Sequence, residues 1–457
     1  MSFLTRALHL TLVIEPEAFL PYLAILIHSF VTISLFVFMS ATTAFLILGP
    51  YNANPMQLGS IMGQLSVADE VLVLGYMVTT LSLFMLPMGQ VWSPDLLLTR
   101  MLFAFGTSCL SSILAAMLAD VVQPKGLPRA TALAGIMSGV GALVAAYGYL
   151  GLGATYCMKI AYFIVGGICG ILGTVVCLLY MYAKPAEDKP TIKQVVVGFG
   201  SVPKLAWQNP FLGLAILGSF GARMTSTVGS LFLSSWFQNY MMYESRECPM
   251  HGDPALYANA TITFCGMDSR CAKAVSAAAA TNGILQTLAL VGAPIAAVFV
   301  EFLPDTTYGM FMACTISAFA FSFMVTVPNP HAKNINGVAA GMGLGQIFMI
   351  ISTQVMLVRN ISSPGMRGTL SAAYSIVGAL GVITVSVGGG DMIDAGFNQG
   401  PFLITGIVCA ILGAFCLVLI GIYRPTNNRN QPKITDEVAV IGDLQKPAAV
   451  VDESNKA

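Results

Sequence analysis

Charged residues are scarce in this chain: Asp, Glu, Lys and Arg together make up only 9% of its 457 residues. Soluble domains carry about 25% charged residues, so the composition excludes a surface that faces water throughout. The mean hydropathy is +0.78, and 56% of the residues are hydrophobic. Lipid therefore has to cover most of the surface, and the composition predicts an integral membrane protein.

Several kinds of functional signal are also missing. The net charge is zero, so the basic patches that nucleic-acid binding needs are not expected. The chain has only four histidines, and it contains no HExxH zinc motif, no phosphate-binding P-loop motif and no nucleophile elbow in context. Most of the ten cysteines lie singly in apolar stretches, which is typical of small core residues. We therefore expect neither an enzyme nor a metal site, and no cofactor or nucleic-acid partner.

What the chain does contain is a series of long apolar stretches. A membrane-spanning helix needs about 20 mostly apolar residues. One further stretch, 56–92, is too long for one comfortable span and short for two spans with a loop, and the acidic pair Asp69-Glu70 lies in its middle. The sequence thus predicts an all-α, polytopic membrane protein with eleven or twelve spans. The ten clear candidates are 19–48, 97–120, 129–151, 157–182, 210–238, 275–300, 308–327, 336–358, 368–389 and 401–423.

Polar segments divide this series into two halves. The segment 184–204 holds four lysines and three prolines, and we interpret it as a loop between the halves. We expect an N-terminal transmembrane half over 1–183, a cytoplasmic central loop over 184–209, a C-terminal half over 210–423 and a disordered tail over 424–457.

The distribution of Lys and Arg predicts which face is cytoplasmic. Cations gather in the 121–128 link, the central loop, the 359–367 link and the start of the tail, so these segments should be cytoplasmic. The polar loop 240–273 is then external. Its sequon Asn259-Ala260-Thr261 predicts glycosylation at Asn259. Its three cysteines, Cys248, Cys265 and Cys271, offer a pair for one disulfide, with free thiols as the alternative.

The two halves share a short repeated pattern. In each, Pro and Gly form a turn between two spans, an arginine follows, and a helix rich in small residues begins. The arginines of the two copies, Arg129 and Arg367, are 238 residues apart, about half the chain. The first copy has Pro124, Arg129, Ala130, Thr131, Ser138, Gly141, Ala142 and Leu143; the second has Pro364, Arg367, Gly368, Thr369, Ser375, Gly378, Ala379 and Leu380.

With this pattern the chain resembles the major facilitator superfamily. That family's link between helices four and five has an acid, a Pro-containing turn, an Arg and a Gly-rich helix, matched here by Asp120, Pro124, Arg129 and Gly135 to Gly141. The resemblance implies two six-helix bundles around one central site. The family's basic signature loop after helix two is absent between Met56 and Arg100. The simplest account is a gap near Glu70 to Gly75, which removes the end of helix two, the loop and the start of helix three.

Charged residues inside the spans are candidates for the transport site, because they are expensive in a membrane. Arg223 lies in mid-span and would either bind an anionic group or form an internal salt bridge with Asp69 or Glu70. One of these two acids could carry a coupling proton; alternatively, both lie at a membrane surface. Arg100 lies near the start of its span, and we expect it to reach the outer interface rather than the site.

Buried amides form a second group of candidates. Asn282 and Gln286 are four residues apart and share one face of a helix, and Gln346 lies inside a later span. Such amides either line a central site or hold helices together, and the second role is the more common. We expect His28 to be a hydrogen-bonded interior residue rather than a proton relay.

The sequence favours a secondary transporter that moves a small solute by alternating access. Coupling to protons is left open, and nothing in the chain selects a substrate. The alternative is a receptor of the same fold that does not transport, or an inactive truncated isoform, which the missing loop favours. We expect a monomer in the plasma membrane.

Overall fold

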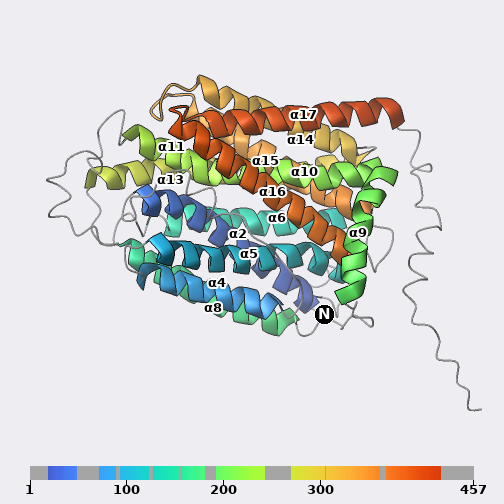
Figure 1. Cartoon of the computed structure of the whole chain (residues 1–457), viewed down its shortest axis with the longest axis horizontal. Coiled ribbons are helices and arrows are strands. Elements are labelled where there is room, and N and C mark those ends of the chain that lie inside the picture. Colours follow the sequence, from blue (N-terminus) through green and yellow to red (C-terminus); the bar gives the residue numbers. More distant parts are fainter. Residues whose placement is uncertain are drawn as a thin grey trace, which may run out of the picture.

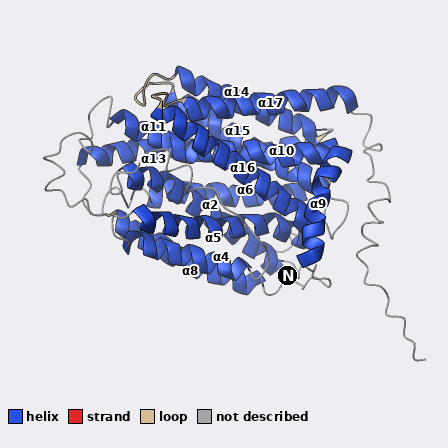
Figure 2. Ribbon diagram, viewed as in Figure 1, coloured by secondary structure: helices blue, strands red, loops and turns tan. Residues whose placement is uncertain are grey.

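The computed structural model describes residues 19–48, 71–88, 93–122, 127–149, 151, 153, 157–180, 192–241, 269–303, 305–360 and 367–423. Helices form almost all of this part (Figure 2), in keeping with its apolar stretches. The elements are α2 (Phe19–Leu48), α4 (Val71–Met85), η2 (Leu86–Met88), α5 (Ser93–Val121), α6 (Leu127–Leu143), η3 (Val144–Tyr149), α8 (Met158–Tyr180), α9 (Ile192–Gln208), α10 (Pro210–Thr227), η4 (Val228–Phe232), α11 (Leu233–Asn239), α13 (Ser269–Phe302), α14 (Thr306–Phe323), η6 (Met324–Thr326), α15 (Ile335–Arg359), α16 (Arg367–Asp394) and α17 (Gly400–Tyr423).

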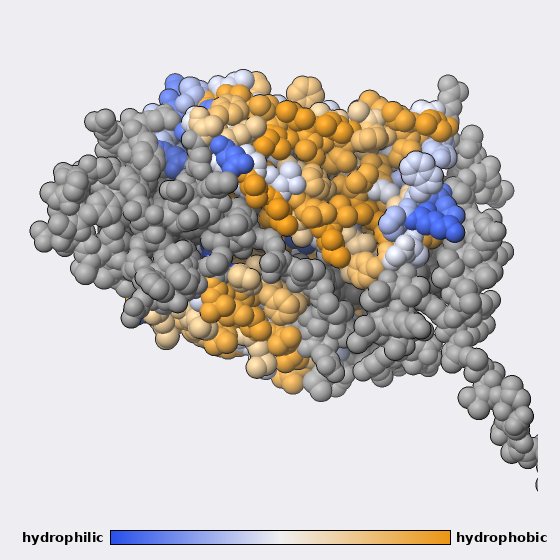
Figure 3. All heavy atoms as spheres, viewed as in Figure 1, coloured by the Kyte–Doolittle hydropathy of each residue, from blue (hydrophilic) through white to orange (hydrophobic). Residues whose placement is uncertain are grey.

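The long helices have the length and composition of membrane spans. Within the described residues, eight helices are long and apolar enough to cross a membrane, and two shorter apolar helices lie at Leu72–Met88 and Leu133–Tyr149. Large apolar side chains point outward, among them Met77, Ile171 and Phe319, which are 65%, 69% and 75% exposed. The described surface is correspondingly apolar over the middle of the visible face and more hydrophilic near its ends (Figure 3). The prediction of an all-α, multi-pass membrane protein is confirmed.

One predicted loop is helical instead. The central segment 184–209 contains α9, which crosses the right-hand ends of the long helices in Figure 1. Phe199, Val202 and Leu205 recur every third residue and pack into the core, while Lys204 and Trp207 are exposed. This spacing is that of an amphipathic helix. The prolines and lysines of the segment led to the prediction of a loop. Pro203, however, lies inside the helix rather than ending it.

Helix packing repeats between the two halves. In the first half α2 packs on α6, and α4 packs on α5 and α8; in the second, α10 packs on α16, and α14 packs on α15 and α17. Close backbone approaches recur at matching glycines. A Cβ on Gly106 of α5 would strike the backbone of Thr79 in α4, and one on Gly345 of α15 would strike the backbone of Ser317 in α14. These glycines are 239 positions apart, close to the separation of the arginines in the predicted repeat.

The repeat identifies α4 as the third helix of its half. Thr79 of α4 is equivalent to Ser317 of α14, which follows α10 and α13. Among the described residues of the first half, no helix is equivalent to α13. Val71 to Gly75 lie within α4, whereas Glu70 lies outside the described residues, so the gap near Glu70 to Gly75 stays a prediction.

The direction of the helices supports this assignment. Leu110 of α5 accepts a hydrogen bond from His28 of α2, and Met39 of α2 accepts one from Arg100 of α5, so α2 and α5 are antiparallel. A Cβ on Gly75 of α4 would contact Leu110, and Gly106 lies against Thr79, so α4 is also antiparallel to α5. The helices α2 and α4 therefore run parallel, and the 22 residues between Leu48 and Val71 begin and end at opposite ends of the bundle.

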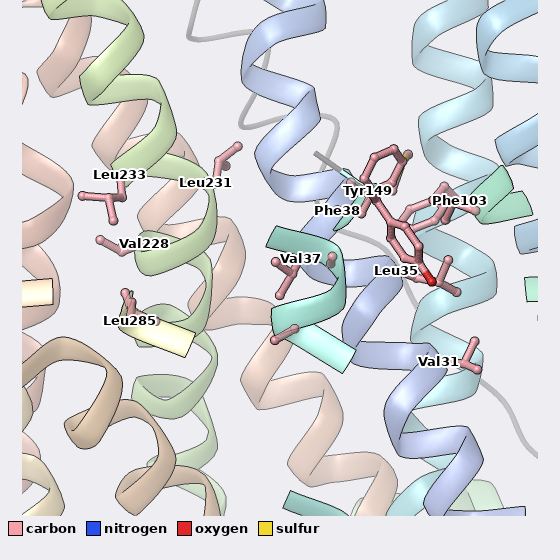
Figure 4. Close-up of a cluster of buried hydrophobic side chains, with 14 of the residues drawn as sticks. Val31, Leu35, Val37, Phe38, Phe103, Tyr149, Val228, Leu231, Leu233 and Leu285 are labelled. Carbon is pink, nitrogen blue, oxygen red and sulfur yellow. The ribbon is translucent and has the colours of Figure 1, made fainter. Parts of the chain in front are cut away.

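The halves meet at several places. The helix α13 of the second half packs lengthwise on α6 of the first, and α2 packs on η4 and α11. The helices α5 and α16 are also in contact, as are α6 and α15. Figure 4 draws the contact of α2 with η4, with Val37 of α2 between Phe38 and Tyr149 on one side and Val228 and Leu231 on the other. One continuous apolar cluster therefore joins both halves.

Candidate functional site

Two π-helical segments flank the middle of α13. The segment η3 ends the α6 span in the first half, and η4 interrupts the α10 span in the second. A Cβ on Gly283 of α13 would strike the ring of Tyr147 in η3, and Leu285 packs against Gly229 of η4. Such local widenings of a helix are frequent at functional sites. The α13 segment Asn282–Gln286 thus lies where the halves meet, which makes it the first place to look for a solute site.

The predicted amide pair lies on this segment. The Gln286 Nε2 donates to the Asn282 Oδ1 at 3.4 Å, so the two side chains do share one face as expected. Asn282 is fully buried and Gln286 is nearly so. The Asn282 Nδ2 has no hydrogen-bond partner within the described part of the chain. A buried N–H without a partner costs free energy, about 1–3 kcal/mol, unless something else binds it.

Gln346 of α15, another helix of the second half, approaches the same region. Its Oε1 would lie 3.5 Å from a Cβ placed on Gly229, beside Leu285 of α13. This oxygen is buried and, among described atoms, accepts no hydrogen bond. An unused acceptor and an unused donor thus occur on two neighbouring helices around η4.

Arg223 lies on another face of the same span. It precedes Gly229 by six residues, and its stem contacts the Cα position of Gly378 in α16, where a Cβ would lie 2.8 Å from Cγ. The side chain is partly exposed. Tyr374 lies one turn before Gly378. Its hydroxyl is hydrogen-bonded to Thr353 Oγ1 at 2.9 Å, and its carbonyl accepts a hydrogen bond from the Ser219 hydroxyl at 2.7 Å. The repeat pattern alone did not point to Tyr374.

The structure therefore brings together some predicted residues and separates others. Asn282, Gln286 and Gln346 gather near η4, whereas Arg223 faces α16. The reason is the position of α10, which packs on both α15 and α16. The sequence did not predict a role for Tyr147, Tyr374 or Gly229. A tyrosine within a helix rich in small residues could have indicated the first two.

The expectation for Arg100 is wrong. Instead of reaching the outer interface, Arg100 is 2% exposed, and its Nη2 donates to the Met39 carbonyl of α2 at 3.1 Å. The position near the start of a span suggested snorkelling, but α2 packs across that part of α5. Arg100 therefore joins two helices inside the first half.

The expectation for His28 is confirmed. Its Nδ1 is 2.7 Å from the Tyr76 hydroxyl, and its Nε2 is 2.8 Å from the Leu110 carbonyl. The ring is fully buried between α2, α4 and α5. Both ring nitrogens are thus used in holding three helices together.

Several predicted residues lie outside the described part of the chain or have side chains outside it. Arg367 begins α16 and Arg129 lies in the first turn of α6, as the repeat predicted, but their side chains, like that of Asp120, are not described. Asp69, Glu70, Asn259 and the tail lie outside the described residues. Among the described residues, no group of three His, Cys, Asp or Glu could hold a metal ion.

Comparison with known proteins gives a family match. A family model described as Major Facilitator Superfamily matches residues 8–385. The magnetosome protein MamH of Paramagnetospirillum magneticum is 22% identical over 231 residues, which cover 50% of this chain and 48% of that protein. The match with this curated relative therefore spans about half its length.

Solved transporter structures share the fold. The nucleoside transporter NupG is 14% identical with a TM-score of 0.57, over 87% of this chain and 99% of that one. FucP in its outward conformation is 14% identical with a TM-score of 0.55, over 88% and 99%. The human organic anion transporter MFSD10 is 12% identical with a TM-score of 0.51, over 86% and 83%. At these identities the likeness establishes the fold alone.

Proposed function

Because this chain belongs to the major facilitator superfamily of transporters, we propose that it carries a small polar solute across a membrane by alternating access. The two halves would tilt against each other along the α13–α6 and α2–η4 contacts. Both contacts are lined by small or apolar residues, which permit sliding and tilting of the helices.

One observation carries the proposal: among the described residues, a donor on Asn282 and an acceptor on Gln346 have no hydrogen-bond partner, and both are buried near the junction of the halves. If these amides only held helices together, both atoms would be satisfied within the protein. A polar solute with its own acceptor and donor would satisfy them instead. This supports solute binding over the structural role that the sequence alone favoured.

Arg223 supports a solute with an anionic group. A cation in mid-span is expensive unless it has a partner or a polar cavity. Its partial exposure and its packing on Gly378 are consistent with a position beside such a cavity. The relatives' solutes provide test compounds: a nucleoside as in NupG, fucose as in FucP, and an organic anion as in MFSD10.

Proton coupling is a separate part of the proposal. Because both ring nitrogens of His28 are hydrogen-bonded, we do not assign it as a proton carrier. Asp69 and Glu70 remain the candidates, as the sequence suggested. We further propose a monomer in the plasma membrane.

One observation in the first half favours a second function, that of a receptor or an inactive form that does not transport. Its described residues provide no equivalent of α13, the helix that in the second half carries the amides and contacts both π segments. A chain that binds a solute but cannot alternate would fit this arrangement.

A thermal-shift screen of the purified protein tests binding first. Uridine, fucose and p-aminohippurate represent the three solute classes. We expect one class to stabilise the wild type and to lose this effect in Asn282→Ala, while Asn334→Ala, which changes an exposed amide at the start of α15, keeps it. A shift that survives Asn282→Ala and Gln346→Ala alike would place the solute elsewhere.

A further inference from the structure

The helix α9 runs across one end of the bundle, whereas the long helices run along it (Figure 1). Its apolar face packs on the core, and Pro203, Lys204 and Trp207 are exposed on the other side. Trp207 is 89% exposed, the highest fraction among the exposed large apolar side chains of the described residues. The described part of the chain therefore leaves this face of α9 uncovered.

The corner between α9 and α10 holds α9 in place. The Asn209 side chain caps the start of α10 by accepting hydrogen bonds from two backbone N–H groups, and its Nδ2 donates to the Asn360 Oδ1 at the end of α15 at 3.2 Å. A Cβ on Gly213 of α10 would lie 2.9 Å from the Ala206 carbonyl of α9. Because α9 packs on α10 and α16, it belongs to the second half and moves with it.

The lipid-facing surface of the spans extends to the level of α9. The ring of Tyr423, the last residue of α17, lies 5.5 Å from the ring of Phe211, which follows Trp207 by four residues. In the same last turns of α17, Val418 and Ile422 are 54% and 68% exposed. Figure 1 likewise shows α17 reaching at least as far along the bundle as α9. Because lipid covers the exposed apolar side chains of a span, lipid reaches α9.

Exposed aromatic side chains gather at this end. Phe302, which ends α13, is 84% exposed, and Tyr423 is 45% exposed. The start of α14, which follows α13 closely, lies at the same end, because Thr306 accepts a hydrogen bond from Arg359 near the end of α15. Together with Trp207, these side chains form the kind of aromatic belt that marks a boundary between membrane and water.

We propose that α9 lies in the headgroup layer of the membrane, where Trp207 inserts between lipid headgroups and Lys204 pairs with the phosphate of an anionic phospholipid. The indole ring is apolar with one N–H donor, a combination that suits the boundary between water and hydrocarbon. A lysine side chain is long enough to extend its ammonium group to the headgroups. The Lys and Arg distribution predicts that this end is cytoplasmic, where anionic lipids attract cations.

The fluorescence of Trp207 tests the anchor. The chain has three tryptophans, so Trp92→Phe combined with Trp236→Phe leaves Trp207 alone. The full chain is reconstituted in vesicles of phosphatidylcholine and phosphatidylglycerol. Lipid brominated near the headgroup should quench Trp207 about twofold more than lipid brominated at the chain ends. The control keeps only Trp236, which is 3% exposed within the protein, and neither lipid should quench it.

The headgroup charge tests the role of Lys204. Brominated phosphatidylglycerol should quench Trp207 about twofold more than brominated phosphatidylcholine, and inorganic phosphate should not compete. Lys204→Gln should abolish this difference, whereas Lys333→Gln, which changes an exposed lysine before α15 at the opposite end, should keep it. Equal quenching by both lipids, or competition by inorganic phosphate, would overturn the pairing with anionic lipid.

Photolabelling of the unmodified protein provides a check that no folding defect affects. A phospholipid with a diazirine in its headgroup should label the peptide that contains Trp207. An unlabelled peptide, together with quenching of Trp207 by water-soluble acrylamide but not by headgroup-brominated lipid, would show that α9 faces water and would overturn the anchor. That result would not affect the solute proposal, and a failure of solute binding would not affect the anchor.

Discussion

Gly141 of α6 lies directly against the backbone carbonyl of Phe30 in α2, and Gly381 of α16 lies in the same way against Phe220 of α10. The two glycines are 240 positions apart, and each belongs to the helix that opens with a repeat arginine. Without a Cβ, the paired backbones can approach closely, as small residues allow in membranes. The same crossing therefore anchors both halves.

Adding one methyl group at either crossing should be costly. A Cβ there would overlap the carbonyl, so Gly141→Ala and Gly381→Ala should each lower the free energy of unfolding by about 1–3 kcal/mol. Gly167→Ala is the matched control, since a Cβ at this helical glycine of α8 meets nothing within 4 Å. That control should gain stability, by about 0.5–1 kcal/mol. Thermal unfolding in detergent measures all three, and equal stability of all three variants would argue against the crossing.

The hydrogen bond between His28 and Tyr76 should be structural. His28→Ala and Tyr76→Phe should each destabilise the protein by about 1–3 kcal/mol, because each leaves buried partners unsatisfied. The double variant should cost less than the sum, with a coupling energy of about 0.5–3 kcal/mol in a thermal double-mutant cycle. Full stability combined with loss of proton-driven uptake would instead make His28 a proton carrier.

The parallel run of α2 and α4 predicts which side of the membrane three exposed residues face. Met88 ends η2, which directly follows α4, Asn334 precedes α15, and Lys204 lies on α9. Cysteines at 88 and 334 should react with an impermeant maleimide on intact cells, and one at 204 only after permeabilisation. Labelling of Met88→Cys only after permeabilisation would mean that α4 runs in the other direction.

The sequence predicted the architecture better than the site. Apolar length and the two arginine turns were sufficient for a two-half membrane bundle, because span length and turn chemistry are local properties. Arg100 was misjudged because its burial depends on α2, 61 residues away in sequence. The helix α9 was missed because its apolar spacing is masked by Pro203 and lysines. Asn282 and Gln346 were named, but only their packing around Gly229 reveals the unused atoms.

Removing either amide should weaken solute binding. A hydrogen bond of about 1–3 kcal/mol corresponds to a loss of about 5- to 150-fold in affinity for Asn282→Ala and for Gln346→Ala. The solute identified by thermal shift is titrated by calorimetry, with Asn334→Ala as the exposed control. If the two variants lose stability but keep their affinity, these amides act as helix-to-helix contacts.

Arg223 should determine selectivity for an anionic group. Arg223→Ala should abolish transport and leave membrane insertion intact, because a mid-span cation cannot be replaced by a small apolar side chain. Arg223→Lys keeps the charge and should restore part of the uptake of an anionic solute. Surface labelling and uptake by the same cells check both points. Unchanged uptake in the alanine variant would remove Arg223 from the site.

The most direct test of alternating access is counterflow in proteoliposomes loaded with the unlabelled form of the solute identified by thermal shift. Trace labelled solute outside should accumulate transiently without any ion gradient, and Asn282→Ala should accumulate little. This result requires one site that opens to both sides in turn. Stable binding without any counterflow would contradict the account and favour a receptor or an inactive form.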